Sequence, residues 1–181
     1  MLPLVGIISA RALMMSALTT FLPTFLTDEG ADLWFAGASL TVLEAAGVIG
    51  ALFGGSMSDR LGRRLVLASS FGITPLLVFA FLGSGGWVML PLLLALGFIF
   101  LNTTPVIMAL VQENFPESRA LANGVYMAIS FIVRSGAVVT VGALGDLFGL
   151  RLAFTVSATL MLVGLPLILL LPRDRPKIIS A

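Results

Sequence analysis

The sequence predicts an all-α membrane protein with six transmembrane helices, and three observations support this prediction. Hydrophobic residues make up 59% of the chain and charged residues only 10%, whereas roughly a quarter of the residues of a soluble domain are charged. The mean hydropathy is +1.11. Long apolar segments alternate with short polar connections, and each segment can cross a hydrocarbon core of about 30 Å as a helix. The segments lack the period of two that is typical of transmembrane β-strands.

Each expected span ends at a short polar connection. In order, the spans are residues 2–26 before TDEGADL, 34–57 before SDRLGRR, 65–83 before GSGG, 88–112 before ENFPESR, 120–143 before GDLFGLR, and 152–171 before a charged tail at 172–181. Connections this short make consecutive helices antiparallel neighbours. Pro23, Pro75 and Pro105 predict kinks. Trp34 and Trp87 are expected at the outer interface.

Lys and Arg residues set the expected orientation, because they are enriched in cytoplasmic connections. With the N-terminus inside, the cytoplasmic side holds Arg60, Arg63, Arg64, Arg119, Arg173, Arg175 and Lys177. Arg151 is then the only basic residue of a connection on the outside, where the acidic segment TDEGAD also lies. We therefore expect a multi-pass protein of a bacterial inner or plasma membrane, with both termini in the cytoplasm.

The residue content argues against several other functions. The chain has no Cys and no His, which removes the usual thiolate and imidazole groups for metal binding and catalysis. A net charge of +1, spread over several connections, gives no basic face for nucleic acid. The sequence has no phosphate-binding loop, nucleophile arrangement or paired-carboxylate site. We expect neither an enzyme nor a metal or organic cofactor.

One motif occurs twice and predicts an internal repeat. GSMSDRLGRRL begins at Gly55 and GALGDLFGLRL begins at Gly142. The matching pairs, each 87 residues apart, are Gly55 and Gly142, Asp59 and Asp146, Gly62 and Gly149, and Arg64 and Arg151. Because this offset contains three spans, repeat one (about 1–87) and repeat two (about 88–174) are inverted relative to each other. In each copy, the second Gly permits a turn with positive φ, and the Arg is expected to reach the Asp or nearby carbonyl groups.

The first copy resembles the signature loop of the major facilitator superfamily, which has the form G-x-x-x-D-R-x-G-R-R. Here the loop consists of Gly55, Asp59, Arg60, Gly62, Arg63 and Arg64, without a departure. FPESRALANG, GDLFGLRLAF and PRDRPK are similar to segments of the C-terminal half of such transporters. FLPTFLTDEG is similar to the end of the seventh helix in drug-efflux members, including the fosmidomycin-resistance type.

The resemblance implies half of a twelve-helix fold, in which two six-helix halves rock around a substrate site. It implies efflux or uptake of a small molecule, as an antiporter or another secondary transporter, with an ion gradient of protons as the expected driving force. The signature loop would lock a gate against the other half, with Asp59 at its centre.

The implied partners are the lipid bilayer, a small-molecule substrate and a second six-helix half. This second half is a separate chain, a missing N-terminal half or a second copy. Because Met1 opens directly on an apolar span, a fragment of a longer parent is the preferred interpretation. A truncated or split half that serves as a non-transporting assembly partner is the alternative.

Polar residues inside the spans are the candidates for contact with substrate or protons: Arg11, Glu44, Asn102, Thr103, Thr104, Tyr126 and Arg134. Arg11 and Glu44 each lie on the order of 14 Å from the start of their span, so a structural ion pair and a transport role are both open. Glu44 is the only carboxylate well inside a span, and we expect it to couple protons.

The remaining candidates also have two interpretations each. Arg134, with Ser130 and Tyr126, forms a polar stripe, and it either snorkels to the interface or contacts an anion. The residues before Pro105 form either a kink, in which Thr hydroxyls bond to the backbone carbonyl that the proline leaves without a partner, or a polar patch that faces the substrate. Gly47, Gly50 and Gly54 lie on one helix face and predict close packing against a neighbouring helix.

Overall fold

The computed structural model describes residues 2–114 and 116–169, which form a helical bundle without strands. Six segments of this part are long and apolar enough to cross a membrane: Gly6–Asp28, Leu33–Leu61, Arg63–Leu82, Gly86–Gln112, Ala120–Phe148 and Leu150–Ile168. They confirm the six predicted spans, although the second and fifth continue through the motif copies to Leu61 and Phe148. Residues 170 and 171 of the last predicted span, and the charged tail, lie outside the described residues.

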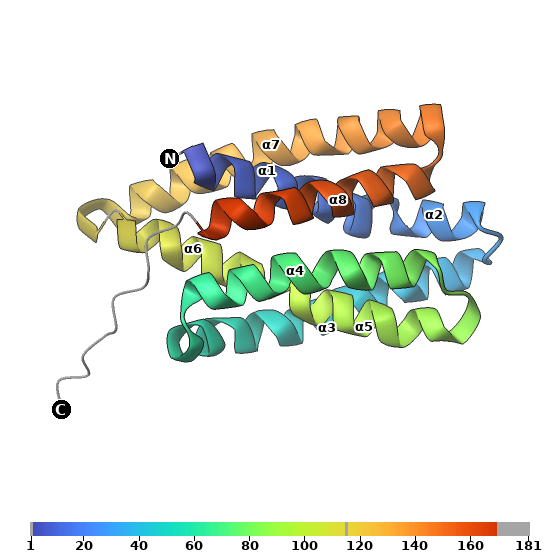
Figure 1. The fold of residues 1–181 in the computed structure, drawn as a ribbon, viewed down its shortest axis with the longest axis horizontal. Helices are drawn as coiled ribbons and strands as arrows, with labels where there is room; N and C mark the ends of the chain where they lie inside the picture. Colours follow the sequence, from blue (N-terminus) through green and yellow to red (C-terminus); the bar gives the residue numbers. More distant parts are fainter. Residues whose placement is uncertain (1, 115, 170–181) are drawn as a thin grey trace.

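The helices run back and forth along the long axis of the bundle (Figure 1). In order they are α1 (Leu2–Ser16), the π-helical η1 (Ala17–Phe21), α2 (Leu22–Asp28), α3 (Leu33–Leu61), α4 (Arg63–Leu82), the 3₁₀ turn η2 (Gly86–Val88), α5 (Met89–Leu101), α6 (Thr103–Asn114), the 3₁₀ turn η3 (Pro116–Ser118), α7 (Arg119–Phe148) and α8 (Leu150–Leu169). We call the end with Arg60, Arg63 and Arg64 the basic end. The opposite end, with Asp28, Glu29 and Asp32, is the acidic end.

The two motif copies terminate their helices in the same way, at opposite ends of the bundle. Gly62, after α3, has φ 91° and ψ 137°, and Gly149, after α7, has φ 88° and ψ 147°. The N–H of Gly62 donates to Ser58 O at 3.0 Å, and the N–H of Gly149 donates to Gly145 O at 2.8 Å. Side chains disfavour this backbone conformation. The predicted inverted repeat and the predicted role of its second glycine are therefore confirmed.

The repeats are interleaved rather than packed as two separate units. α1, from repeat one, packs on α7 and α8 of repeat two. The α5 helix, from repeat two, packs on α3 and α4 of repeat one. Figure 1 shows α1, α7 and α8 together along one side of the bundle and α3, α4 and α5 along the other. Each repeat therefore depends on the other for its packing.

Two spans are interrupted at equivalent positions of the two repeats. In the first span, the π-helical turn Ala17–Phe21 precedes Pro23. In the fourth, the helix breaks at Asn102, three residues before Pro105. Thr103 Oγ1 donates to Phe100 O at 2.6 Å beside this break, which supports the prediction of a kink with Thr hydroxyl contacts. The helix α4 remains continuous through Pro75.

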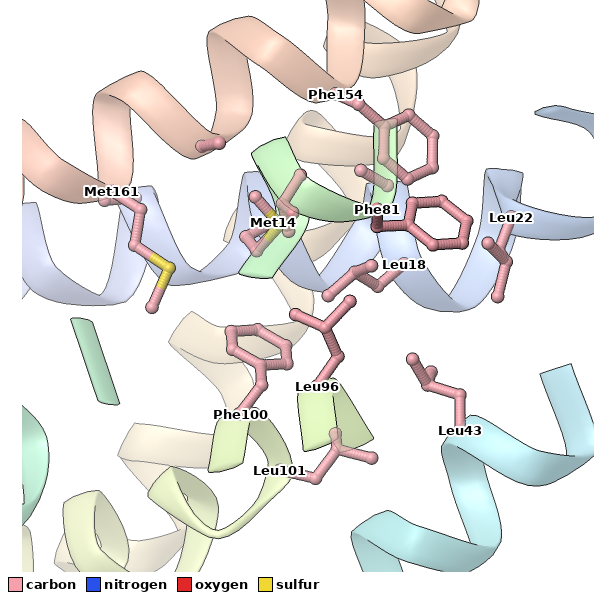
Figure 2. Packing of buried hydrophobic residues seen from close by; sticks show 14 of the residues in the cluster. Met14, Leu18, Leu22, Leu43, Phe81, Leu96, Phe100, Leu101, Phe154 and Met161 are labelled. Carbon is pink, nitrogen blue, oxygen red and sulfur yellow. The ribbon is translucent and has the colours of Figure 1, made fainter. Parts of the chain in front are cut away.

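The core combines close backbone contact with large side chains. A Cβ atom on Gly50 would lie 2.2 Å from Phe98 O, and one on Gly97 would lie 2.1 Å from Leu43 O. This confirms the predicted close packing of α3 and identifies α5 as its neighbour. Figure 2 shows Met14 and Leu18 of the first span among the buried side chains, near Phe100 of α5.

Candidate functional site

Arg11, in the first span, is held by the break in the fourth span. Its Nε donates to Thr103 Oγ1 at 2.8 Å, and its Nη2 donates to Thr104 Oγ1. The guanidinium carbon lies 5.5 Å from the centre of the Phe100 ring, a cation–π contact. Because Phe100, Thr103 and Thr104 flank Asn102, the interruption itself supplies all three contacts.

Arg134 of α7 approaches the same region from the other side. Its Nη2 donates to Thr19 Oγ1 at 3.3 Å, and Thr19 Oγ1 donates in turn to Met15 O at 2.8 Å. Thr19 lies in the π-helical turn. The interruption of the first span therefore provides the hydrogen-bond acceptor for Arg134, just as the interruption of the fourth span provides the acceptors for Arg11. Arg11 is within Coulombic range of both Arg134 and Tyr126. We call Arg11, Thr19, Thr103, Thr104, Tyr126 and Arg134 the arginine cluster.

The open alternative of an ion pair between Arg11 and Glu44 is wrong. Within residues 2–114 and 116–169, Arg11 bonds to threonines, and neither Arg11 nor Arg134 has a carboxylate partner. Glu44 is exposed on α3, and α3 packs mainly on α5 rather than on α1. Arg11 and Glu44 lie at similar depths along their spans, but this does not bring them into contact, because interleaving of the repeats separates α1 from α3.

Glu44 and Asn102 lie apart from the arginine cluster, in different surroundings. Glu44 shares an exposed stripe of α3 with Thr41 and Val48, one turn to either side. It makes no ion pair or hydrogen bond with the part of the chain that is described. Asn102 is 3% exposed, and a Cβ atom on Gly54 would lie 3.1 Å from its Oδ1. Asn102 therefore packs against α3 instead of facing the cluster.

In the first motif copy, Arg63 contacts Asp59. Arg63 Nη2 lies 3.7 Å from Asp59 Oδ1, one helical turn apart. Asp59 and Arg60 are exposed, whereas Arg63 is buried. The exposed Asp59 carboxylate at the basic end is thus accessible to a further chain.

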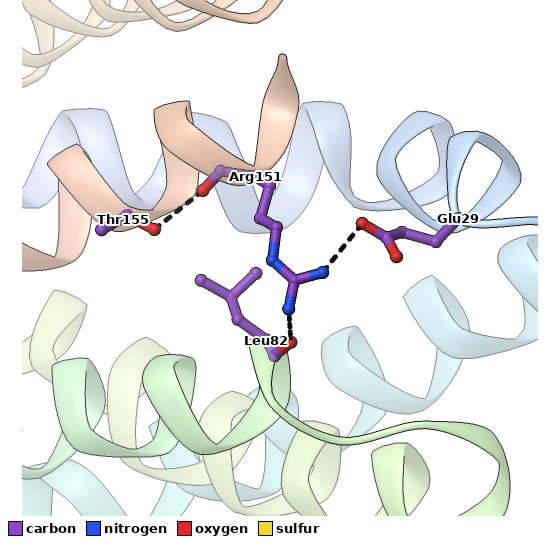
Figure 3. Close-up of polar contacts among 4 residues, drawn as sticks. All are labelled: Glu29, Leu82, Arg151 and Thr155. Carbon is purple, nitrogen blue, oxygen red and sulfur yellow. Dashed lines mark hydrogen bonds and ion pairs between the residues drawn. The ribbon is translucent and has the colours of Figure 1, made fainter. Parts of the chain in front are cut away.

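The second motif copy ties three helices together at the acidic end (Figure 3). Arg151 Nη1 lies 3.3 Å from Glu29 Oε1, and Arg151 Nη2 donates to the carbonyl of Leu82, the last residue of α4. A helix C-terminus carries partial negative charge, which favours this cation. The predicted reach of Arg151 to a carbonyl is confirmed, whereas Asp146 is exposed and is not its partner.

The sequence did not identify four contact residues: Thr19, Phe100, Glu29 and Leu82. Thr19 follows Arg11 by eight residues, which places both on one helix face; this spacing was the available signal. Nothing in the sequence predicts that Phe100 faces Arg11 or that Glu29 pairs with Arg151, because both contacts join helices of different repeats.

The acidic end also has a cavity of about 520 Å³, lined by residues that include Phe35, Trp87 and Met89. Its lining contains none of the candidates predicted for contact with substrate or protons. No group of three or more carboxylates in the described ranges is placed to hold a metal ion.

Comparisons with known proteins place this geometry in a family. The chain matches the model of the Major Facilitator Superfamily over residues 4–180. It is 28% identical to the uncharacterized MFS-type transporter YfnC of Bacillus subtilis (strain 168), over 71% of this chain and 31% of that protein. It is 31% identical to an uncharacterized transporter of Buchnera aphidicola subsp. Schizaphis graminum (strain Sg), over 65% of this chain and 29% of that protein.

A solved structure shares the fold. It is the crystal structure of a mutant of the peptide transporter POT in complex with alafosfalin, with a TM-score of 0.79 and 17% identity, over 93% of this chain and 37% of the other. The chain spans about a third of the length of the relatives it matches. The family match covers nearly the whole chain, and six helices are long and apolar enough to cross a membrane. The chain is a multi-pass integral membrane protein that belongs to the Major Facilitator Superfamily.

Proposed function

We propose that the chain is one six-helix half of a secondary transporter, which moves a small molecule by alternating access together with a second six-helix half. The observation that supports this most directly is the arginine cluster, which lies at the interruptions of two spans. Interrupted helices at corresponding positions of two repeats are the best pointer to a transporter's binding site. A purely structural bundle has no need for two arginines so far from the interfaces, since a charge there costs at least about 2.5 kcal/mol.

The second half is proposed to cover the sides of α3 and α7 that remain open. The share of the apolar segment that is buried within the bundle is only 11% for α7 and 33% for α3, whereas it is 50% for α4. One of these two helices, α7, carries Tyr126 and Arg134 of the arginine cluster, and the other, α3, packs on α6, which carries Thr103 and Thr104. A second half docked on them would enclose the cluster between the two halves, and Asp59 at the basic end would then face it as the proposed gate lock.

Protons are the proposed coupling ion, and Glu44 is the proposed coupling residue. Its exposed position on α3 would face the second half, where protonation can change with the state of the transporter. We propose that the basic end lies in the cytoplasm of a bacterial cell, in accordance with the distribution of Lys and Arg. The alternative is a half that assembles with another membrane protein without transport.

Reconstitution tests the proposal. The chain is placed in liposomes alone and together with a candidate six-helix N-terminal half, and the uptake of a panel of labelled small molecules is measured under an imposed proton gradient. We expect flux with both halves, loss of this flux when a protonophore collapses the gradient, and only background flux with the chain alone. If the two halves co-purify, and flux stays at background throughout the panel, the assembly-partner alternative is correct.

A further inference from the structure

Two guanidinium groups of the arginine cluster share one region of the bundle without a negative charge. Arg11 and Arg134 have only hydroxyl groups as hydrogen-bond partners in the described residues, and each is within Coulombic range of the other. Charges inside a membrane protein normally pair with opposite charges or face a cavity. Because neither guanidinium has an opposite charge as a partner, an anion bound between them would stabilise both.

We propose that Arg11 and Arg134 bind an oxyanion group of the transported substrate, so that the substrate is a small organic anion. This inference rests on the proposed transport function and names the substrate class of the same site. The planar guanidinium has N–H groups in a fixed fork, which matches the oxygens of a carboxylate or a phosphate group.

The hydroxyl partners hold the two side chains ready for such a ligand. Thr103 and Thr104 use Nε and Nη2 of Arg11, and Phe100 lies against its guanidinium, so that the plane of the group is fixed. Nη1 of Arg11 has no partner in the described part of the chain. Thr19 holds Arg134 through Nη2 alone. Fixing the donors before binding reduces the entropy lost when the ligand arrives.

No carboxylate of the described residues is placed to neutralise the pair. Glu44 lies on α3, which packs on α5 and not on α1. Glu29 is engaged by Arg151 at the acidic end, and Asp32 caps α3 by accepting from the N–H of Phe35. The negative charge has to come from a ligand or from another chain.

The test measures anion binding to the purified full chain in a neutral detergent, by calorimetry at constant ionic strength. The probes are benzoate, inorganic phosphate and the neutral benzamide, and the variants are Arg11→Gln, Arg134→Gln and Arg11→Lys. We expect benzoate or phosphate to bind and benzamide not to bind. Each Gln variant should weaken the affinity about tenfold or more, because it removes a charged hydrogen-bond donor. Arg11→Lys should retain part of the affinity, since it keeps the charge but not the fork.

Arg119→Gln, at the first residue of α7, is the control of equal charge change and should bind as the unmodified chain does. Stability gives a second readout: without anion, Arg134→Gln should unfold at a temperature no lower than that of the unmodified chain, because it removes a charge that has no opposite partner. Equal anion binding in the unmodified chain and both Gln variants would overturn the proposal, as would binding of neither anion.

Two further measurements are needed. One distinguishes a lipid headgroup from a soluble anion as the source of the oxyanion, and the other distinguishes failure of anion binding from failure of transport. If added phosphatidylglycerol displaces the soluble anion, the site binds lipid headgroups and the substrate assignment is overturned. If the two reconstituted halves transport only neutral solutes and no anion binds, the anion inference fails and the transport function stands. If the anion binds and no flux occurs with both halves, the transport function fails instead.

Discussion

Replacing Gly50 with alanine should destabilise the folded chain by about 3 kcal/mol, the upper part of the range for overpacked sites. The new Cβ atom would lie 2.2 Å from Phe98 O, and a backbone carbonyl cannot rotate away as a side chain does. The helices α3 and α5 would have to separate, and the contact of Gly97 with Leu43 O would open with them. The measurement is the unfolding midpoint of the purified chain in detergent, together with the fraction that elutes as a single species.

Gly37→Ala is the matched control in the same helix. Gly37 is exposed, and a Cβ atom there would meet nothing within 4 Å. Alanine has a helix propensity about 1 kcal/mol better than that of glycine, so this variant should be as stable as the unmodified chain or slightly more so. If Gly50→Ala and Gly37→Ala unfold at the same midpoint, α3 and α5 are not in the backbone contact described above.

Replacing Glu44 with glutamine should abolish the accumulation of solute that a proton gradient drives in the reconstituted pair of halves. Glutamine keeps the size and hydrogen-bonding capacity of the side chain but cannot take up or release a proton at neutral pH. Exchange of labelled for unlabelled solute at equal pH on both sides needs no net proton movement and should continue. The measurement compares gradient-driven uptake with exchange in the same proteoliposomes.

The control for this variant is Glu117→Gln, the same change at an exposed turn of the basic end. It should leave both activities unchanged. If Glu44→Gln retains gradient-driven accumulation, Glu44 does not couple protons. If it loses exchange as well, its role is in substrate binding or folding, and the coupling assignment is equally wrong.

The sequence determines the fold well because its strongest signals are local. A long apolar segment has to cross the bilayer as a helix, and a turn such as those at Gly62 and Gly149 requires a residue without a side chain. The repeated motif therefore predicted two equivalent helix ends, and the structure has them. The glycine pattern of α3 likewise predicted close packing, although it could not name α5 as the partner.

The site was less predictable because its contacts depend on which helices are neighbours. Depth along a span follows from residue number, but direction around the helix and the identity of the neighbour do not. Arg11 and Glu44 matched in depth and face different helices. The threonines that hold Arg11, and the Leu82 carbonyl that binds Arg151, come from the other repeat. Interleaving of the repeats thus determines the arginine cluster, and only the folded chain shows it.

The inverted repeat is tested most directly by labelling thiols at its two equivalent helix ends. Leu61, at the end of α3, is 56% exposed, and Phe148, at the end of α7, is 64% exposed. The chain has no cysteine, so Leu61→Cys and Phe148→Cys each give a single reactive site. A maleimide that cannot cross membranes is added to intact cells and to cells with a permeabilised membrane. We expect Phe148→Cys to react in intact cells and Leu61→Cys to react only after permeabilisation. Reaction of both thiols from the same side of the membrane would contradict the inverted repeat.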